Sequence, residues 1–364
     1  MKLTSVSLYS AVLGLAHASP VYKRAGITDA DILNYALTLE HLEAAFYEEG
    51  LKNYTQADFV NAGMKDPFYS NLKMVGMDEQ SHEQFLTQAL TGKYSLHSYT
   101  CLVKQDSIVT DFLYSGWSQT CGEMRVFIPC HGCEQLPCSR KRFRSAYLGA
   151  AASIMNDTYL TAAGSILTVE ARHSAYLRAV LGEAPAAQAF DNPLDLNEVY
   201  TVASPFIVSC PSSNQPLPVK AFPSLTMISS APTMNGATVQ FMTGSSFDTS
   251  NTTGIYAAFI TVTGPVWTPV TSNGDGKFTV TIPMGIAGQS YVVLTKGNSQ
   301  ATDDNIVAGP AIVECYIYVR NENANNVLGF GLGLHDFSFY NHDRVRYCIS
   351  HLQRSTWSGF KQPY

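Results

Sequence analysis

The sequence predicts a mainly α-helical N-terminal half, arranged as a four-helix bundle, followed by a β-rich C-terminal region. In several segments between residues 28 and 202, apolar residues recur at three- and four-residue steps, the period of helices with one buried face. Residues 224–314 are instead rich in the β-branched and aromatic residues that favour strands. Four prolines in residues 210–223 mark a linker between the two regions.

The first residues have the pattern of a secretory signal peptide, which we place at residues 1–18. Lys2 precedes the apolar stretch Leu8–Leu15, and Ala16-His17-Ala18 gives the small-x-small order of a cleavage site. Residues 19–26 then read as a short propeptide, since the dibasic pair Lys23-Arg24 is a second candidate processing site. Two ordinary basic residues are an equally good interpretation of that pair.

Three Asn-x-Ser/Thr triplets support export, with glycosylation acceptors at Asn53, Asn156 and Asn251. In an oxidising compartment the eight cysteines favour disulfides over zinc ligation, and Cys210 with Cys101 is one candidate pair. We therefore expect a secreted, extracellular glycoprotein that is associated with cell-wall material in one reading.

Composition limits the partners of the chain. The net charge is −6 and the pI is near 5.8, which argues against a nucleic-acid surface. After the signal, no apolar run approaches the roughly 20 residues that a transmembrane helix needs. The sequence thus predicts neither nucleic-acid binding nor a transmembrane segment.

The predicted bundle extends over residues 27–209. Thr28 or Asp29 caps its first helix and Gly50 ends it, and residues 53–63 form a polar connection. Small residues in the third helix are spaced to let helices approach closely. The predicted helices are 28–49, 67–90, 145–155, 158–181 and a shorter one at 196–202.

The β-rich domain is placed at residues 224–314, as a small β-sandwich or a β-rich extension. Asn273-Gly-Asp-Gly276 is a strong turn signal between two of its strands. The predicted strands are Val239–Thr243, Ile255–Val262, Lys277–Ile282 and Tyr291–Leu294.

Two Glu-x-x-His pairs are the main candidates for a functional site in the sequence. Residues i and i+3 share one helix face, so Glu79 with His82, and Glu170 with His173, each project a carboxylate and an imidazole together. Di-metal carboxylate bundles use two such pairs and one Glu from each of the other two helices. The ligand types suit two iron or manganese ions.

The first helix supplies the expected single Glu. Glu40 lies among apolar residues and is the preferred ligand, with Glu43 as the alternative. We expect Glu43, Glu48 and Glu49 to face water, and His41 to be an outer or surface residue.

Three stretches, Leu33–Tyr47, Asp78–His82 and Leu160–His173, resemble the ferritin-like domain of fungal Rds1-type stress-response proteins, which are related to plant desiccation-associated proteins. The resemblance extends to Ser145–Ala150 and Pro218–Pro223. It implies a ferritin-like bundle, secretion and a role in stress or development, without a settled catalytic activity.

One departure from that family concerns the third helix. The family has a Glu shortly before the segment that begins at Ser145, where this chain has Ser139–Arg144 without an acid. Five of six expected ligands are thus present. The atypical segment 97–144 and the atypical tail 315–364 show no sustained helical or strand periodicity of apolar residues. Retained introns are one explanation, and sequencing of the transcript would test it.

Two functions remain open from the sequence. The first is a di-iron or di-manganese oxidoreductase of oxidase, ferroxidase or catalase type, with Glu40, Glu79, His82, Glu170 and His173 as metal ligands. The second is a non-enzymatic secreted or cell-wall glycoprotein with a degenerate metal site, which the missing acid favours.

Overall fold

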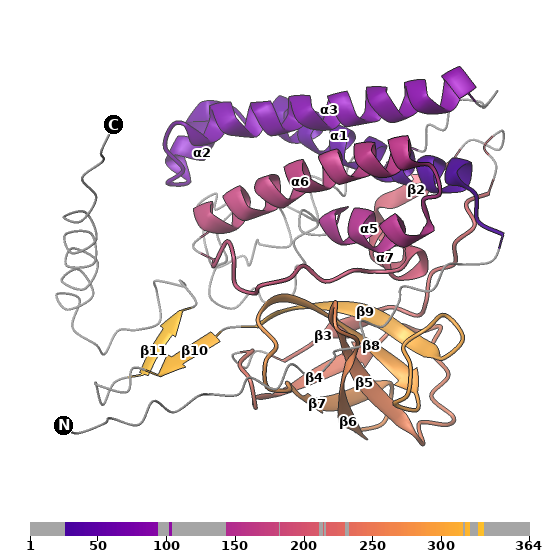
Figure 1. Ribbon diagram of the computed structural model, residues 1–364. Coiled ribbons are helices and arrows are strands. Elements are labelled where there is room, and N and C mark those ends of the chain that lie inside the picture. Colours follow the sequence, from indigo (N-terminus) through magenta and orange to yellow (C-terminus); the bar gives the residue numbers. More distant parts are fainter. Residues whose placement is uncertain are drawn as a thin grey trace, which may run out of the picture.

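The computed structural model shows a helical part stacked on a β-sheet part (Figure 1). Helices α1 and α3 form an outer layer, and α5, α6 and α7 lie between that layer and the strands. The residues that the structure describes are 26–93, 102–103, 143–181, 183–210, 214, 216–229, 233–315, 317–320 and 327–330. The predicted signal peptide, the short propeptide and Cys101 lie outside them.

Helix α1 (Asp29–Asn53) begins at a capping box. The Thr28 hydroxyl accepts from the Asp31 amide at 3.3 Å, and the Asp31 carboxylate accepts from the Thr28 amide at 2.9 Å. The prediction that Gly50 ends this helix was wrong, because the helix continues to Asn53. Residues 53–63 are not a plain connection either, since they contain the short helix α2 (Gln56–Asn61).

Helix α3 (Phe68–Lys93) runs antiparallel to α1, which fixes which of their residues are level with each other. Near one end Leu33 and Leu37 pack with Leu86 and Leu90. Further along α1, His41 Nδ1 lies 2.9 Å from a Glu83 carboxylate oxygen on α3. The middle of α1 is buried on more than one face, since consecutive residues such as Leu39 and Glu40 are both covered.

The remaining helices complete the bundle. Asn156 caps α6 by accepting from the amides of Thr158 (2.9 Å) and Tyr159 (3.2 Å). Asp195 caps α7 in the same way. These elements are α5 (Phe143–Ala150), the 3₁₀ turn Ala151–Ser153, α6 (Asp157–Val180), α7 (Leu196–Ala203) and a second 3₁₀ turn Ser204–Phe206.

The C-terminal region is a seven-stranded antiparallel sheet with the order β3-β4-β7-β6-β5-β8-β9. Strand β6 pairs with β5 through its first half and with β7 through its second half, so it links two packed halves. Phe241, Phe259 and Phe278 are fully buried between them. The strands are β3 (Leu225–Met227), β4 (Thr238–Thr243), β5 (Ile255–Ile260), β6 (Val266–Ser272), β7 (Lys277–Thr281), β8 (Gly288–Lys296) and β9 (Ile306–Cys315).

Two small strand pairs lie outside this sheet. Strands β1 (Leu102–Val103) and β2 (Ile207–Ser209) are antiparallel, as are β10 (Ile317–Arg320) and β11 (Val327–Phe330). The second pair shows that the segment 315–364, which has no clear pattern in sequence, contains a strand pair. Among the described helices, none is long and apolar enough to cross a membrane.

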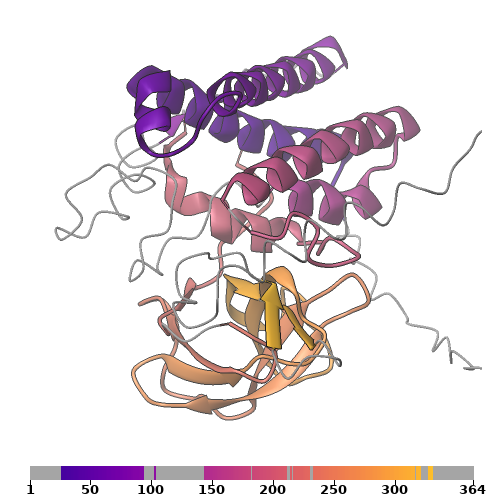
Figure 2. The same ribbon diagram turned by 90° about the vertical axis from the view of Figure 1, so that its left-hand side faces the viewer.

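The helical and β parts share a buried interface (Figure 2). Tyr291 of β8 is 1% exposed, packs in the apolar cluster of α1, α5 and α7, and bonds Ser145 Oγ at 3.1 Å. Arg178 of α6 donates to both carboxylate oxygens of Glu314 on β9, at 2.9 and 2.5 Å. The bundle therefore packs against one face of the sheet, formed by β5, β8 and β9.

Candidate metal centre

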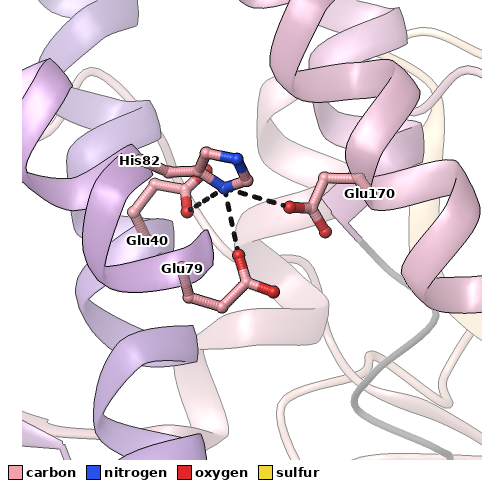
Figure 3. A group of neighbouring side chains, drawn as sticks. All are labelled: Glu40, Glu79, His82 and Glu170. Carbon is pink, nitrogen blue, oxygen red and sulfur yellow. Dashed lines mark hydrogen bonds and ion pairs between the residues drawn. The ribbon is translucent and has the colours of Figure 1, made fainter. Parts of the chain in front are cut away.

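Four buried side chains from three helices converge in the middle of the bundle (Figure 3). Glu40 comes from α1, Glu79 and His82 come from α3, and Glu170 comes from α6. One potential ligand atom of each lies within 4.8 Å of those of the others. All four are at most 9% exposed, so water hardly competes for them.

The imidazole of His82 lies among three carboxylates. Its Nδ1 is 3.1 Å from Glu79 Oε2, 3.4 Å from Glu170 Oε1 and 3.5 Å from Glu40 Oε2. A single nitrogen that faces three oxygens at these distances marks a point where one cation would meet four ligands.

His173 faces the same carboxylates from the other side. Its Nδ1 is 3.0 Å from Glu79 Oε1 and 3.9 Å from Glu170 Oε1. The ring centres of His82 and His173 are 6.5 Å apart. Glu79 therefore spans the two imidazoles with one oxygen each, and Glu170 lies between them as well, which is the arrangement of bridging carboxylates in di-metal bundles.

Two further residues hold this set in place. Asp78 is half exposed, and its Oδ2 lies 3.0 Å from Nε2 of His173. That contact fixes the ring so that Nδ1 faces inward, as outer carboxylates commonly do for ligating histidines. Tyr147 of α5 donates a short hydrogen bond to Oε1 of Glu40. The sequence offered no signal for Tyr147, because nothing in its spacing links it to Glu40.

Burial and crowding change the pKa values of the acids. Burial raises the pKa of Glu170 to about 8 against an ordinary 4.5, with Glu79 and Glu40 adding to the rise. Burial also raises the pKa of Glu40. For Glu79, burial raises the pKa but hydrogen bonds to His173 and His82 outweigh it, so the net change is downward.

The pKa values of the two imidazoles are raised as well, but here the carboxylates cause the rise and burial opposes it. Burial lowers the pKa of His82, but hydrogen bonds to Glu170, Glu40 and Glu79 outweigh burial and bring the value to about 12. The pKa of His173 is raised in the same way, chiefly by Glu79. Without a metal, protons on the histidines and on Glu170 therefore offset part of the negative charge of the carboxylates.

The orphaned atoms of the cluster fit a metal ion. Within the described part of the chain, four buried atoms here have ion-pair contacts inside the cluster but no well-aligned hydrogen bond: Glu40 Oε2, Glu79 Oε1, Glu170 Oε1 and His173 Nδ1. Buried polar atoms are normally paired, and an ion is one explanation when they are not. Carboxylate oxygen and imidazole nitrogen are ligands that iron and manganese accept.

Glu43 is the acid that the sequence interpretation misplaced. It was expected to face water, but it is 6% exposed and its Oε2 is buried without a hydrogen-bond partner among the described residues. Burial raises its pKa well above the ordinary value, and Glu170, Glu79 and Glu40 raise it further. Glu48 is exposed as expected, whereas Glu49, which was also expected to face water, is half-buried. His41 pairs with Glu83 outside the cluster.

The predicted glycosylation positions lie at or near the surface. Asn53 and Asn251 are exposed, and Asn156 is half-buried at the start of α6. Cys210 directly follows β2, whose partner strand β1 begins one residue after Cys101. Glycosylation and the pairing of these cysteines stay predictions.

Comparison with known proteins places the helical part in a known domain class. The ferritin-like domain family matches residues 28–113 and 144–183, which carry every residue of the cluster. The protein rds1 of Schizosaccharomyces pombe is 24% identical over 212 residues, which are 58% of this chain and 47% of that protein. The helical part is thus similar to ferritin-like domains, and the aligned region covers about half the length of that relative.

Proposed function

We propose that this ferritin-like domain binds two iron or manganese ions between α1, α3 and α6, in a secreted protein of stress or development. One observation carries the metal proposal: Nδ1 of His82 and Nδ1 of His173 both face Glu79, at 3.1 and 3.0 Å, in a space closed to water. Two inward imidazoles that share a carboxylate are the core of a carboxylate-bridged pair.

Each side chain has a part in this proposal. Glu79 and Glu170 lie between the two imidazoles and would bridge the ions, while Glu40 and His82 would bind at one side and His173 at the other. Bound iron or manganese would supply redox chemistry with dioxygen or peroxide, as in oxidases, ferroxidases or catalases. The chain itself contributes a dry site and carboxylates whose protons leave when metal binds.

Metal analysis tests the proposal. The purified protein is stripped, reconstituted with Fe(II) or Mn(II), and analysed by mass spectrometry of the metal. We expect about two ions per chain for the wild type and for His41→Ala, a histidine outside the cluster. His82→Ala should lose at least one of them. A wild type with less than about one ion per chain contradicts the proposal.

A second candidate is a non-enzymatic secreted or cell-wall glycoprotein with a degenerate site. The observation in its favour is that α5 (Phe143–Ala150) contains no acidic residue. If it holds, Glu79→Ala leaves both the metal content and the stress survival of the producing cell unchanged. A loss of either favours the metal protein.

Secretion rests on the first 18 residues and the three glycosylation triplets. The stress or development role rests on the resemblance to Rds1-type proteins. We expect the protein in the culture medium or wall fraction, with a mass that falls on treatment with an N-glycosidase. Retention inside the cell with an intact N-terminus would contradict this.

A further inference from the structure

The two sides of the cluster are unequal. On one side, His82 has a carboxylate of its own, Glu40, besides the shared Glu79 and Glu170. On the other side, the carboxylates close to Nδ1 of His173 are, among the described residues, the shared pair alone. Carboxylate-bridged bundles normally give each metal one terminal acid, and the second comes from the third helix. Helix α5 brings Tyr147 to Glu40 instead.

The register of α1 against α3 places another acid level with Glu79. His41 is level with Glu83, and a Cβ on Gly76 would lie 3.1 Å from Cβ of Tyr47. Glu43 falls between these two levels, beside the turn of α3 that carries Glu79. It is one helical turn from Glu40 and on the same face of α1.

Glu43 is also buried in the manner of a ligand. It is 6% exposed, and its Oε2 has no hydrogen-bond partner within the described ranges. The acids that act on it electrostatically are Glu170, Glu79 and Glu40, all members of the cluster. A carboxylate that is buried beside three others needs a proton or a cation, because an uncompensated buried charge is strongly unfavourable.

We propose that Glu43 is the terminal carboxylate of the second metal ion, on the His173 side, so that α1 supplies two of the site's acids and α5 supplies none. This inference rests on the proposed di-metal function. It replaces the absent acid of the third helix with a residue that lies three positions, or about one turn, along α1 from Glu40. The site then has six protein ligands from three helices.

Two isosteric variants test it. Glu43→Gln removes the negative charge at constant shape, and Glu48→Gln makes the same change at an exposed position of the same helix. Mn(II) is titrated into each metal-free protein by equilibrium dialysis, and electron paramagnetic resonance reports whether two ions are coupled. Circular dichroism confirms that each variant is folded.

The expected results separate the two ions. The wild type and Glu48→Gln bind two Mn(II) ions and give a coupled spectrum. Glu43→Gln keeps one ion, binds the second at least tenfold more weakly, and gives a spectrum of isolated Mn(II). If Glu43→Gln does not fold, Glu43→Asp takes its place and should also weaken the second ion.

Two outcomes contradict the inference in different ways. If the folded Glu43 variant binds both ions like the wild type, Glu43 is not a ligand, although the di-metal function stands. If the wild type binds no Mn(II) or Fe(II), the proposed function fails and this assignment fails with it. Combining Glu43→Gln with His173→Ala should cost no further ion, because both residues serve the same one.

Discussion

Tyr147 shows how α5 takes part in the cluster without an acid. Its side chain is 7% exposed, and its hydroxyl donates to Oε1 of Glu40. That leaves Oε2 of Glu40 to face Nδ1 of His82, which lies 3.5 Å away. A neutral donor behind a carboxylate orients it without competing for a cation.

Removing this hydroxyl should weaken metal binding on the His82 side. We expect Tyr147→Phe to bind the first ion about tenfold more weakly, the lower range for loss of an outer hydrogen bond. Tyr176→Phe is the control, since the Tyr176 hydroxyl bonds Asn71 at 3.2 Å, away from the cluster. Equal affinities of the two variants, measured by dialysis, would show that Tyr147 does not orient Glu40.

Metal binding should release protons. At pH 7 the metal-free site holds one on His82, whose pKa is about 12, and one on Glu170, whose pKa is about 8. Both must leave for these atoms to bind metal, so affinity should rise with pH between 6 and 8. Calorimetry in two buffers of different ionisation enthalpy measures the release, and identical heats would contradict it.

The same groups set the stability of the metal-free protein. The folded-state pKa of Glu170 is raised from 4.5 to about 8, so its stabilising contribution is complete below pH 4.5 and is lost as pH rises through 8. The contribution of His82 is complete below pH 6.5 and declines towards pH 12. The metal-free Tm should therefore fall between pH 6 and pH 9, and the metal-loaded Tm should fall less. A rising metal-free Tm would contradict this.

Residue spacing predicted part of the cluster and not the rest. The structure brings together Glu40, Glu79, His82, Glu170 and His173. The two Glu-x-x-His pairs among them could be predicted because residues i and i+3 share a helix face, a spacing that is visible in the sequence. Glu43 was assigned to solvent because periodicity assumes one buried face, whereas α1 is buried on several. The contact of Tyr147 depends on how α5 crosses α1, which no local pattern encodes.

At the scale of elements, one glycine sets how closely α5 approaches the chain before α7. A Cβ on Gly149 would lie 1.7 Å from the carbonyl oxygen of Leu194, so only glycine fits there. The amide of Leu194 donates to the Ser145 carbonyl at 3.1 Å in the same contact. Gly149 is thus one small residue of this helix that allows a close approach, here between α5 and the backbone at Leu194.

Two alanine substitutions should therefore have opposite effects. Gly149→Ala should destabilise the fold by about 1–3 kcal/mol, because backbone must move to make room. Gly164→Ala in α6 meets no described atom within 4 Å and should stabilise by about 0.5–1 kcal/mol. Urea unfolding measures both, and a Gly149→Ala midpoint at or above that of the wild type would contradict the close contact.

The strands that the sequence analysis missed were hidden for two physical reasons, an internal proline or a very short length. β6 contains Pro269 and β9 contains Gly309-Pro310, and proline within an apolar run argues against a strand because it cannot donate to the ladder. β3 has three residues, too few to show a period. The turn at Asn273–Gly276 was found because Gly274, Asp275 and Gly276 have positive φ, which the sequence signals directly.

At the scale of the whole molecule, Arg178 couples the bundle to the sheet. Its guanidinium is 2% exposed, bonds both oxygens of Glu314, and donates to the Ala184 carbonyl at 2.8 Å. Removing one partner of a buried pair leaves the other charge uncompensated, which costs more than the pair itself contributes.

We expect Arg178→Gln to lower the free energy of unfolding by about 1.5–3 kcal/mol, because Glu314 is 23% exposed and water partly compensates its charge. Arg172→Gln, an exposed arginine on the same helix, should change it by less than about 0.5 kcal/mol. Urea unfolding followed by circular dichroism measures both. Equal stabilities would mean that the apolar interface around Tyr291, and not this ion pair, joins the two parts.

The separation of the ligands along the chain has a consequence for how such sites diversify. His82 and Glu170 meet in space, yet their helices are joined by a long stretch of chain, and the ferritin-like match itself falls in two pieces around residues 114–143. Closing a loop costs only about 0.6 kcal/mol more for each doubling of its length. Insertions in this connection therefore add little entropic cost to folding. A pair of metal ions bound between α1, α3 and α6 would act as a cross-link, and it would keep the ligand geometry whatever the length of the chain between α3 and α6.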